Sequence, residues 1–188
     1  MPCRARWGST GLVALGCSIG GRIVLDLAAR HASEFRAVIG LQSSSHVVPY
    51  YDVAWTHRPD VHGGEVCAAI VSGLMAPQSP EAERWETLWH YMQGGPGVFR
   101  GDLHFYKTEG DLRGQLAAID TGAIPVWLLT GDYDYSCSPE ATLETAAAIP
   151  GAHATIMQRL GHFPMSENYA LFRTHLLPVL AAIRAGAA

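Results

Sequence analysis

A glycine-flanked serine between an apolar segment and a helix-like segment is the most constraining feature of this sequence. Residues 16–21 read Gly-Cys-Ser-Ile-Gly-Gly and contain the pattern G-x-S-x-G around Ser18. Residues 11–16 predict a buried strand, and residues 19–31 carry apolar side chains at helical spacing. A strand that turns so sharply into a helix needs small residues around the serine, whose hydroxyl then projects above the sheet. The pattern predicts a serine nucleophile, and a glycine-rich turn with an N-capping serine is the simpler alternative.

The rest of the chain alternates short apolar strands with helices. Further strands are predicted at 35–41, 124–130 and 152–157, and helices at about 139–148 and 166–185. This alternation is typical of an α/β fold with a mainly parallel sheet and helices on both faces. We therefore expect one domain over residues 1–188, with its core in residues 1–45 and 119–188.

A long segment of different character, about residues 46–118, interrupts this alternation. Two helices are predicted within it, at 64–75 and 80–92. The segment is rich in Trp, Tyr and Phe, which suits either its own packing or contact with an apolar ligand. Trp55 and Trp89 are the candidate substrate contacts, and ordinary packing is an equally weighted alternative for each of them.

An acid and a histidine follow the serine in the order that nucleophilic catalysis would require. A serine hydroxyl needs a base to remove its proton, and the base needs a partner that fixes its tautomer. Asp132 and Asp134 follow the strand at 124–130, and His162 follows the strand at 152–157. Their spacing alone does not decide which aspartate meets His162.

Together these motifs resemble the α/β-hydrolase fold superfamily, and the likeness extends from the serine strand to the final helix. The resemblance implies a Ser-His-Asp triad of Ser18, His162 and Asp134, with the backbone N–H of Ile19 as one oxyanion donor. It favours Asp134 because the acid commonly stands three residues after the glycine, here Gly131. It also implies that residues 46–118 form a helical cap.

The implied activity is cleavage of a carboxylic ester or a related acyl bond through an acyl-enzyme. The expected substrate is a small apolar or aromatic acyl compound. Hydrolysis of a lactone or of a carbon–carbon bond is an alternative of the same class. Neither a metal nor an organic cofactor is expected, because His57 and His62 around Asp60 lack the spacing of a metal site. Cys17 precedes the serine and is interpreted as a small packing residue.

Charge and cysteine content exclude several other classes. The net charge of −4 is spread along the chain, which argues against a nucleic-acid-binding surface. No apolar run is long enough to span a membrane. The four cysteines form no close pair, and we interpret them as reduced thiols of a cytoplasmic protein.

Members of this superfamily usually carry about four strands before the nucleophile strand, and a loop among them supplies the second oxyanion N–H. Only ten residues precede Gly11 here, so we expect an N-terminally truncated version of the fold. The pair His62 and Gly63 has the residue types of such a loop, but it follows the serine in the chain instead of preceding it. An alternative function is therefore a weakly active or non-catalytic interaction module, which would form homo-oligomers through its exposed N-terminal strand edge.

Overall fold

A four-stranded parallel sheet forms the centre of the described part of the chain. The structure, a computed structural model, describes residues 11–47, 64–94 and 101–186. The strands are β1 (Leu12–Cys17), β2 (Phe35–Leu41), β3 (Val126–Gly131) and β4 (His153–Met157). Their order in the sheet is β1-β2-β3-β4, and every neighbouring pair is parallel. The predicted α/β fold with a parallel sheet is confirmed, and all four predicted strands form within two residues of their expected bounds.

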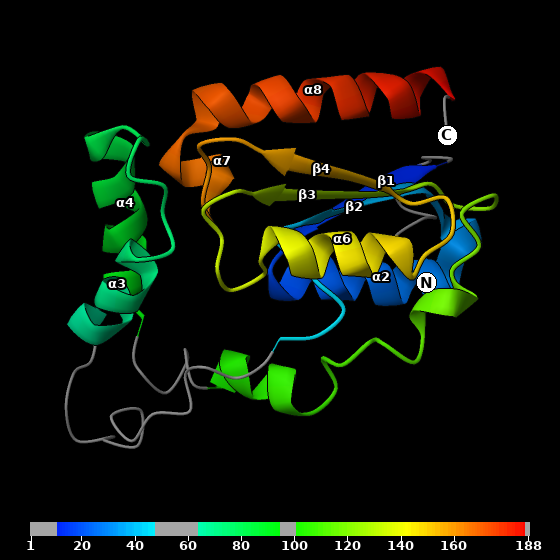
Figure 1. Ribbon diagram of the computed structural model, residues 1–188, viewed down its shortest axis with the longest axis horizontal. Helices are drawn as coiled ribbons and strands as arrows, with labels where there is room; N and C mark the ends of the chain where they lie inside the picture. Colours follow the sequence, from blue (N-terminus) through cyan, green and yellow to red (C-terminus); the bar gives the residue numbers. More distant parts are fainter. Residues whose placement is uncertain (1–10, 48–63, 95–100, 187–188) are drawn as a thin grey trace, which may run out of the picture.

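Helices cover both faces of this sheet. Figure 1 shows α8 (Tyr169–Ala185) on one face, and α2 (Ile19–His31) with α6 (Pro139–Ala147) on the other. Side chains of β2 alternate between the two layers, because successive residues of a strand point to opposite faces. Val38 packs with α2, whereas Ala37 and Ile39 pack with α8. Burial on both faces explains why β2 and β3 are almost continuously apolar.

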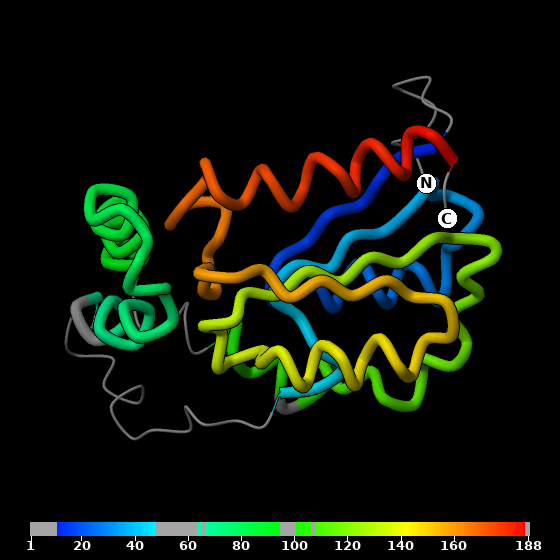
Figure 2. The backbone as a smooth tube through the Cα atoms, turned by 45° about the horizontal axis from the view of Figure 1, so that its top comes forward, coloured from blue at the N-terminus to red at the C-terminus, as the bar shows by residue number. Residues whose placement is uncertain are grey.

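The outer strand β1 is covered less completely than its neighbours. Among the described residues β1 pairs only with β2, and Figure 2 shows it at the side of the sheet away from β4. Leu12, Val13 and Leu15 are exposed, whereas β3 is almost entirely buried. Oligomer formation through this edge stays a prediction.

The predicted cap helices lie at the carboxyl ends of the strands. The insert contains α3 (Gly64–Ser72), α4 (Glu81–Met92), η3 (Phe105–Lys107) after a helical turn at 101–104, and η4 (Leu116–Ala118). Figure 1 shows α3 and α4 beside α7 (Pro164–Glu167), beyond the tips of β3 and β4. The Thr87 hydroxyl of α4 donates to Ser166 Oγ of α7 at 3.0 Å, and this contact joins the insert to the segment after β4.

The C-terminal segment differs from the single helix that was expected. Asn168 has an extended backbone (φ −162°) and separates α7 from α8, and its side chain accepts a hydrogen bond from the N–H of Leu171. Asn is a good N-cap because its short side chain reaches the free amides of the first turn. The last helix therefore begins at Tyr169, three residues later than the pattern predicted.

An unusual hydrogen bond closes the carboxyl end of β2. Gln42 follows this strand with a left-handed backbone (φ 48°) and is fully buried. Its N–H donates to the carbonyl of Leu129 at 2.9 Å, and its side-chain Oε1 accepts from the N–H of Gly131 at 2.9 Å. The chain can thus leave the sheet at Gln42 while β3 continues.

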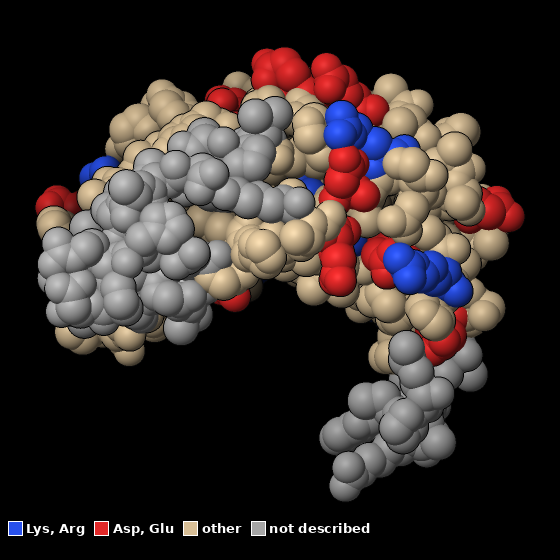
Figure 3. Space-filling view, turned by 90° about the horizontal axis from the view of Figure 1, so that it is seen from below, with Lys and Arg blue, Asp and Glu red and all other residues tan. Residues whose placement is uncertain are grey.

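No helix in the described part of the chain is both long and apolar enough to cross a membrane. On the described part of the face in Figure 3, basic side chains lie beside acidic ones and form no continuous basic patch. Arg113 illustrates this arrangement because it pairs with Asp111 at 2.6 Å.

Candidate active site

Ser18 occupies a strained turn between β1 and α2. Its backbone has φ 55° and ψ −114°, a combination that costs energy for a residue other than glycine. A Cβ at Gly16 would lie 2.1 Å from the carbonyl oxygen of Gly20, and one at Gly21 would lie 2.4 Å from Cβ of Ser43. A Cβ at Gly20 would meet no atom within 4 Å. Close contacts therefore exclude any side chain at Gly16 and Gly21. They do not exclude one at Gly20, the second glycine of the G-x-S-x-G pattern.

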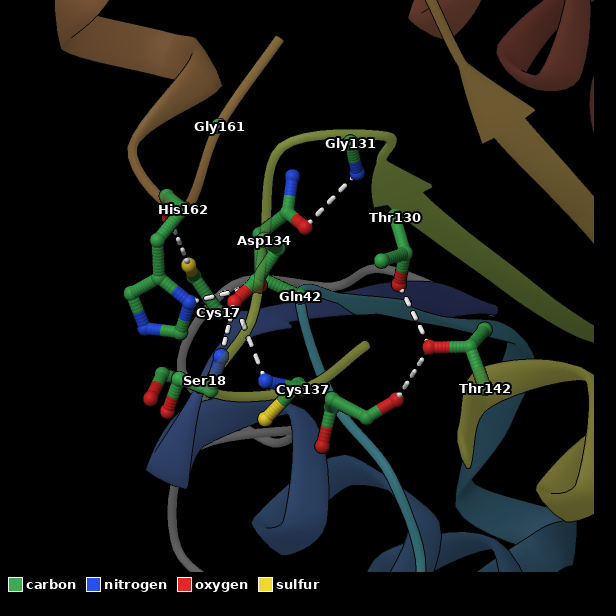
Figure 4. Close-up of polar contacts among 12 residues, drawn as sticks. Cys17, Ser18, Gln42, Thr130, Gly131, Asp134, Cys137, Thr142, Gly161 and His162 are labelled. Carbon is green, nitrogen blue, oxygen red and sulfur yellow. Dashed lines mark hydrogen bonds and ion pairs between the residues drawn. The ribbon is translucent and has the colours of Figure 1, made fainter. Parts of the chain in front are cut away.

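The structure brings Asp134 to His162. Oδ2 of Asp134 lies 2.6 Å from Nδ1 of His162, and both side chains are buried. Figure 4 shows the two residues meeting between the loops that follow β3 and β4. Oδ1 of Asp134 accepts hydrogen bonds from the backbone N–H groups of Ser136 and Cys137, at 2.8 and 3.0 Å. These bonds stabilise the carboxylate and fix the oxygen that faces the imidazole.

Asp132 has a different place in the same loop. Its Oδ1 accepts a hydrogen bond from the backbone N–H of Leu160 at 3.3 Å, so it links the loop after β3 to the loop after β4. The two aspartates diverge because the chain turns between them, where the N–H of Asp134 bonds to the carbonyl of Gly131 at 3.1 Å. Of the two, Asp134 is the one that can orient the imidazole.

Backbone contacts hold the loop that carries His162. The N–H of His162 donates to the carbonyl of Leu74 at 2.8 Å, which joins the loop to the segment after α3. A Cβ at Gly161 would lie 2.2 Å from the same carbonyl oxygen, and a Cβ at Gly131 would lie 2.1 Å from the carbonyl of Leu160. The position of the imidazole therefore depends on close main-chain packing that only glycine permits.

Glu167 adds a buried carboxylate beneath this loop. Its Oε1 accepts a hydrogen bond from the N–H of Gly161, and the side chain is fully buried. Burial raises the pKa of Glu167 to about 7, against the opposing effect of the backbone N–H groups of Gly161 and Ala76.

A pocket of about 230 Å³ opens above the serine and the histidine, and both residues line it. Apolar side chains from the insert and the histidine loop dominate its walls: Ile70, Val71, Leu74, Leu103 and Phe163. Asp102 is exposed and is the one carboxylate among the described lining residues. Such a lining suits an uncharged apolar group.

Of the two substrate contacts predicted from the sequence, only Trp89 lies within the described residues. Trp89 lies on α4, is 61% exposed and is not among the residues that line the pocket. Trp55 lies outside the described residues, as do His57, Asp60 and His62. The helix of Trp89 instead turns Tyr91 toward the pocket, two residues later. Burial raises the pKa of Tyr91 to about 12, with smaller contributions from Cys17 and Asp102.

Tyr106 is a pocket residue that the sequence patterns did not single out. Its phenolic oxygen lies 2.8 Å from Oγ of Ser18, and its side chain is buried. Its only sequence signal was membership of the aromatic-rich insert, which did not distinguish it from the other aromatic residues.

Cys17 lies beside the site but is poorly suited to be a nucleophile. Burial, followed by the negative charge of Asp134, raises the pKa of its thiol well above the ordinary range. Its Sγ donates to the carbonyl of His162 at 3.7 Å, so it packs against the histidine loop. Cys17, Cys67 and Cys137 all remain free thiols in the described structure. Within the described residues, no group of three or more His, Cys, Asp or Glu side chains could hold a metal ion.

Comparisons with known proteins agree with this architecture. No family model matches the sequence, and no curated protein is similar enough to be counted as a relative. A hydrolase from Pseudomonas aeruginosa PA01 has a TM-score of 0.77 at 20% identity, over 95% of this chain and 68% of that chain. The enol-lactonase from Burkholderia xenovorans LB400 has a TM-score of 0.72 at 21% identity, with the same coverage.

A third solved structure carries the name of the fold. MGS-M2, described as an alpha/beta hydrolase enzyme from a Medee basin deep-sea metagenome library, has a TM-score of 0.64 at 15% identity. The match covers 96% of this chain and 68% of that one. With the parallel sheet covered by helices on both faces, these likenesses show that the chain has the α/β-hydrolase fold.

Proposed function

We propose that this chain is a serine hydrolase that cleaves a carboxylic ester or a related acyl bond. The observation that carries the proposal is the convergence of Ser18 and His162 on one pocket, with Asp134 bonded to the far nitrogen of the imidazole at 2.6 Å. The three groups come from loops at the carboxyl ends of three parallel strands, β1, β3 and β4. This placement supports concerted use of the three side chains, because those loops meet at one edge of the sheet.

The chemistry follows from these positions. Nε2 of His162 takes the proton of Ser18 as Oγ adds to the substrate carbonyl. Asp134 holds the Nδ1–H and stabilises the imidazolium that forms. The N–H of Ile19, in the first turn of α2, is not needed by the helix and is available to the oxyanion. His162 then gives its proton to the departing alkoxide, and a water molecule repeats the sequence to release the acid.

The pocket lining supports an uncharged apolar or aromatic acyl substrate. Its walls are aliphatic and aromatic, and burying a charged substrate group there without a partner would be costly. Among the solved structures, the enol-lactonase acts, by its name, on an enol lactone. A lactone is a cyclic ester, so the same acyl chemistry would serve either substrate.

Active-site labelling tests this function. A fluorophosphonate probe should modify wild-type protein once, at Ser18, and a p-nitrophenyl ester should give a burst of p-nitrophenol followed by turnover. Ser18→Ala should abolish both signals. Ser72→Ala is the matched control, because Ser72 is an exposed serine on α3. The Ser72→Ala protein should still be labelled at Ser18 and should hydrolyse the ester at the wild-type rate. Folded wild-type protein that is neither labelled nor active would instead favour the non-catalytic interaction module.

A further inference from the structure

The cap places one hydroxyl group directly beside the proposed nucleophile. Tyr106 belongs to η3, 88 residues along the chain from Ser18, and its Oη lies 2.8 Å from Oγ. The Tyr106 side chain is 7% exposed and lines the same pocket as Ile19. A proton donor on a rigid ring therefore stands next to the atom that would form the new bond.

A buried arginine fixes this tyrosine. Arg22 lies on α2, one helical turn after Ser18, and its side chain is fully buried. Its guanidinium carbon is 4.5 Å from the centre of the Tyr106 ring, within the range of a cation–π contact. The contact holds the ring in place, and it puts a positive charge against the face of the phenol that bonds to Ser18.

The loop after Tyr106 also holds the guanidinium of Arg22. Nη1 of Arg22 donates a hydrogen bond to the carbonyl of Gly110, and the N–H of Gly110 donates to the carbonyl of Phe105 at 2.9 Å. A Cβ at Gly110 would lie 2.8 Å from that Phe105 oxygen and 3.1 Å from Nη1 of Arg22. The chain thus folds tightly around the guanidinium, which leaves the Tyr106 hydroxyl little freedom to move away from Ser18.

We propose that Tyr106 is a catalytic residue whose hydroxyl donates a hydrogen bond to the oxyanion, beside the N–H of Ile19. The oxyanion is bonded to the same carbon as Oγ, so a donor 2.8 Å from Oγ can reach it by a small rotation of its O–H. The Ser18 proton passes to His162, and Tyr106 keeps its own proton throughout. This role rests on the serine hydrolase function proposed above, and it gives that function a second donor for the oxyanion.

The phenolic oxygen can be removed without removing the ring. Tyr106→Phe keeps the aromatic face against Arg22 and should fold like wild type, with an unchanged Tm. Loss of one oxyanion donor typically lowers kcat by about 10²–10³-fold. For a p-nitrophenyl ester we therefore expect kcat to fall by about that factor, with KM within about threefold of wild type.

A matched control comes from the surface. Tyr169 also lies beneath an arginine, with the Arg173 guanidinium carbon 5.9 Å from the centre of its ring, but it is 57% exposed and does not line the pocket. Tyr169→Phe should leave kcat and KM unchanged. A fall in kcat that is equal in both variants would overturn the proposed role of Tyr106.

A second readout separates stabilisation of the oxyanion from simple placement of Ser18. A trifluoromethyl ketone adds to the serine and forms a stable tetrahedral alkoxide, so its equilibrium affinity reports on the oxyanion donors. Tyr106→Phe should weaken this inhibitor by about the same factor as it lowers kcat/KM. Unchanged inhibitor affinity would overturn the role of Tyr106 even if kcat fell. Wild-type protein that fails to react with fluorophosphonate would instead overturn the hydrolase function itself.

Discussion

The nucleophile turn and the pocket roof are built in opposite ways. In the nucleophile turn, residues 16–21, main chain packs on main chain, and an added Cβ at Gly16 would lie 2.1 Å from a carbonyl oxygen. In the pocket roof, formed by α3 and α4, side chains make the contacts, and Trp85 and Trp89 remain 62% and 61% exposed. The nucleophile turn is therefore fixed by close main-chain contacts, whereas two of the largest side chains of the roof lie mostly in solvent and outside the pocket lining.

The largest effect is expected where the backbone contact is closest. Gly16→Ala would drive a methyl group into the carbonyl of Gly20, and no rotation of a side chain can relieve that clash. We expect a loss of about 4 kcal/mol or more in the free energy of unfolding, and little soluble active protein. Urea denaturation and ester hydrolysis would measure both effects.

Gly20→Ala is the control within the same motif. Its Cβ would meet no atom within 4 Å, and it lies in α2, where alanine is the better helix former. We expect activity close to wild type and a gain of up to about 1 kcal/mol in stability. Equal damage by the two substitutions would show that the turn does not depend on the contact at Gly16.

The next largest effect should distinguish the two aspartates that follow β3. Asp134→Asn keeps the size of the side chain but removes the charge that stabilises the imidazolium, and in triad enzymes such a change lowers kcat by about 10⁴-fold. Asp132→Asn should cost about 1 kcal/mol of stability or less, because Asp132 only accepts the N–H of Leu160. Steady-state kinetics on both folded variants would test this ranking, and the opposite ranking would make Asp132 the acid.

Glu167 lies between the histidine loop and the segment after α3, and it should make the stability of the protein depend on pH. Burial raises its pKa from 4.5 to about 7, so the folded protein binds more protons than the unfolded chain between these values. This residue's contribution is therefore most favourable below pH 4.5, and it is lost as the pH rises through 7. The loss amounts to roughly 3 kcal/mol at 1.36 kcal/mol per pKa unit.

Glu167→Gln should flatten that part of the profile. Urea denaturation of wild type and variant at several pH values between 4.5 and 7 measures the difference directly. Parallel curves for the two proteins would mean that Glu167 is not responsible for the dependence.

The smallest effect is expected in the exposed part of the roof. Trp89→Ala should change stability by about 0.5 kcal/mol or less and kcat/KM by less than about twofold, because its indole is largely in solvent. A tenfold fall in kcat/KM would show that Trp89 reaches the substrate, as its sequence position suggested.

The sequence predicted the parts of the protein that follow from local pattern and chain order. The strands β1 to β4 were identified by short apolar runs. An acid after β3 that meets His162 was implied by the resemblance to the α/β-hydrolase fold, which also favoured Asp134 over Asp132 where the spacing left both open. The orientation of α4 was not predictable, because its aromatic residues occur on both sides of the helix. The contact of Tyr106 with Arg22 and Ser18 depends on how a long insert folds back over the sheet, and no local spacing encodes that.

At the end of β2, a side chain replaces a main-chain carbonyl as the hydrogen-bond acceptor of the neighbouring strand. In a regular parallel ladder the N–H of Gly131 would bond to the carbonyl of residue 42, but the left-handed backbone of Gln42 turns that carbonyl away. The carboxamide of Gln42 takes its place. Glycine would adopt the same backbone more easily, yet it would leave a buried N–H unpaired at a cost of about 1–3 kcal/mol. At position 42, a side chain long enough to bond the N–H of Gly131 is therefore more favourable than the glycine that the backbone conformation alone would prefer.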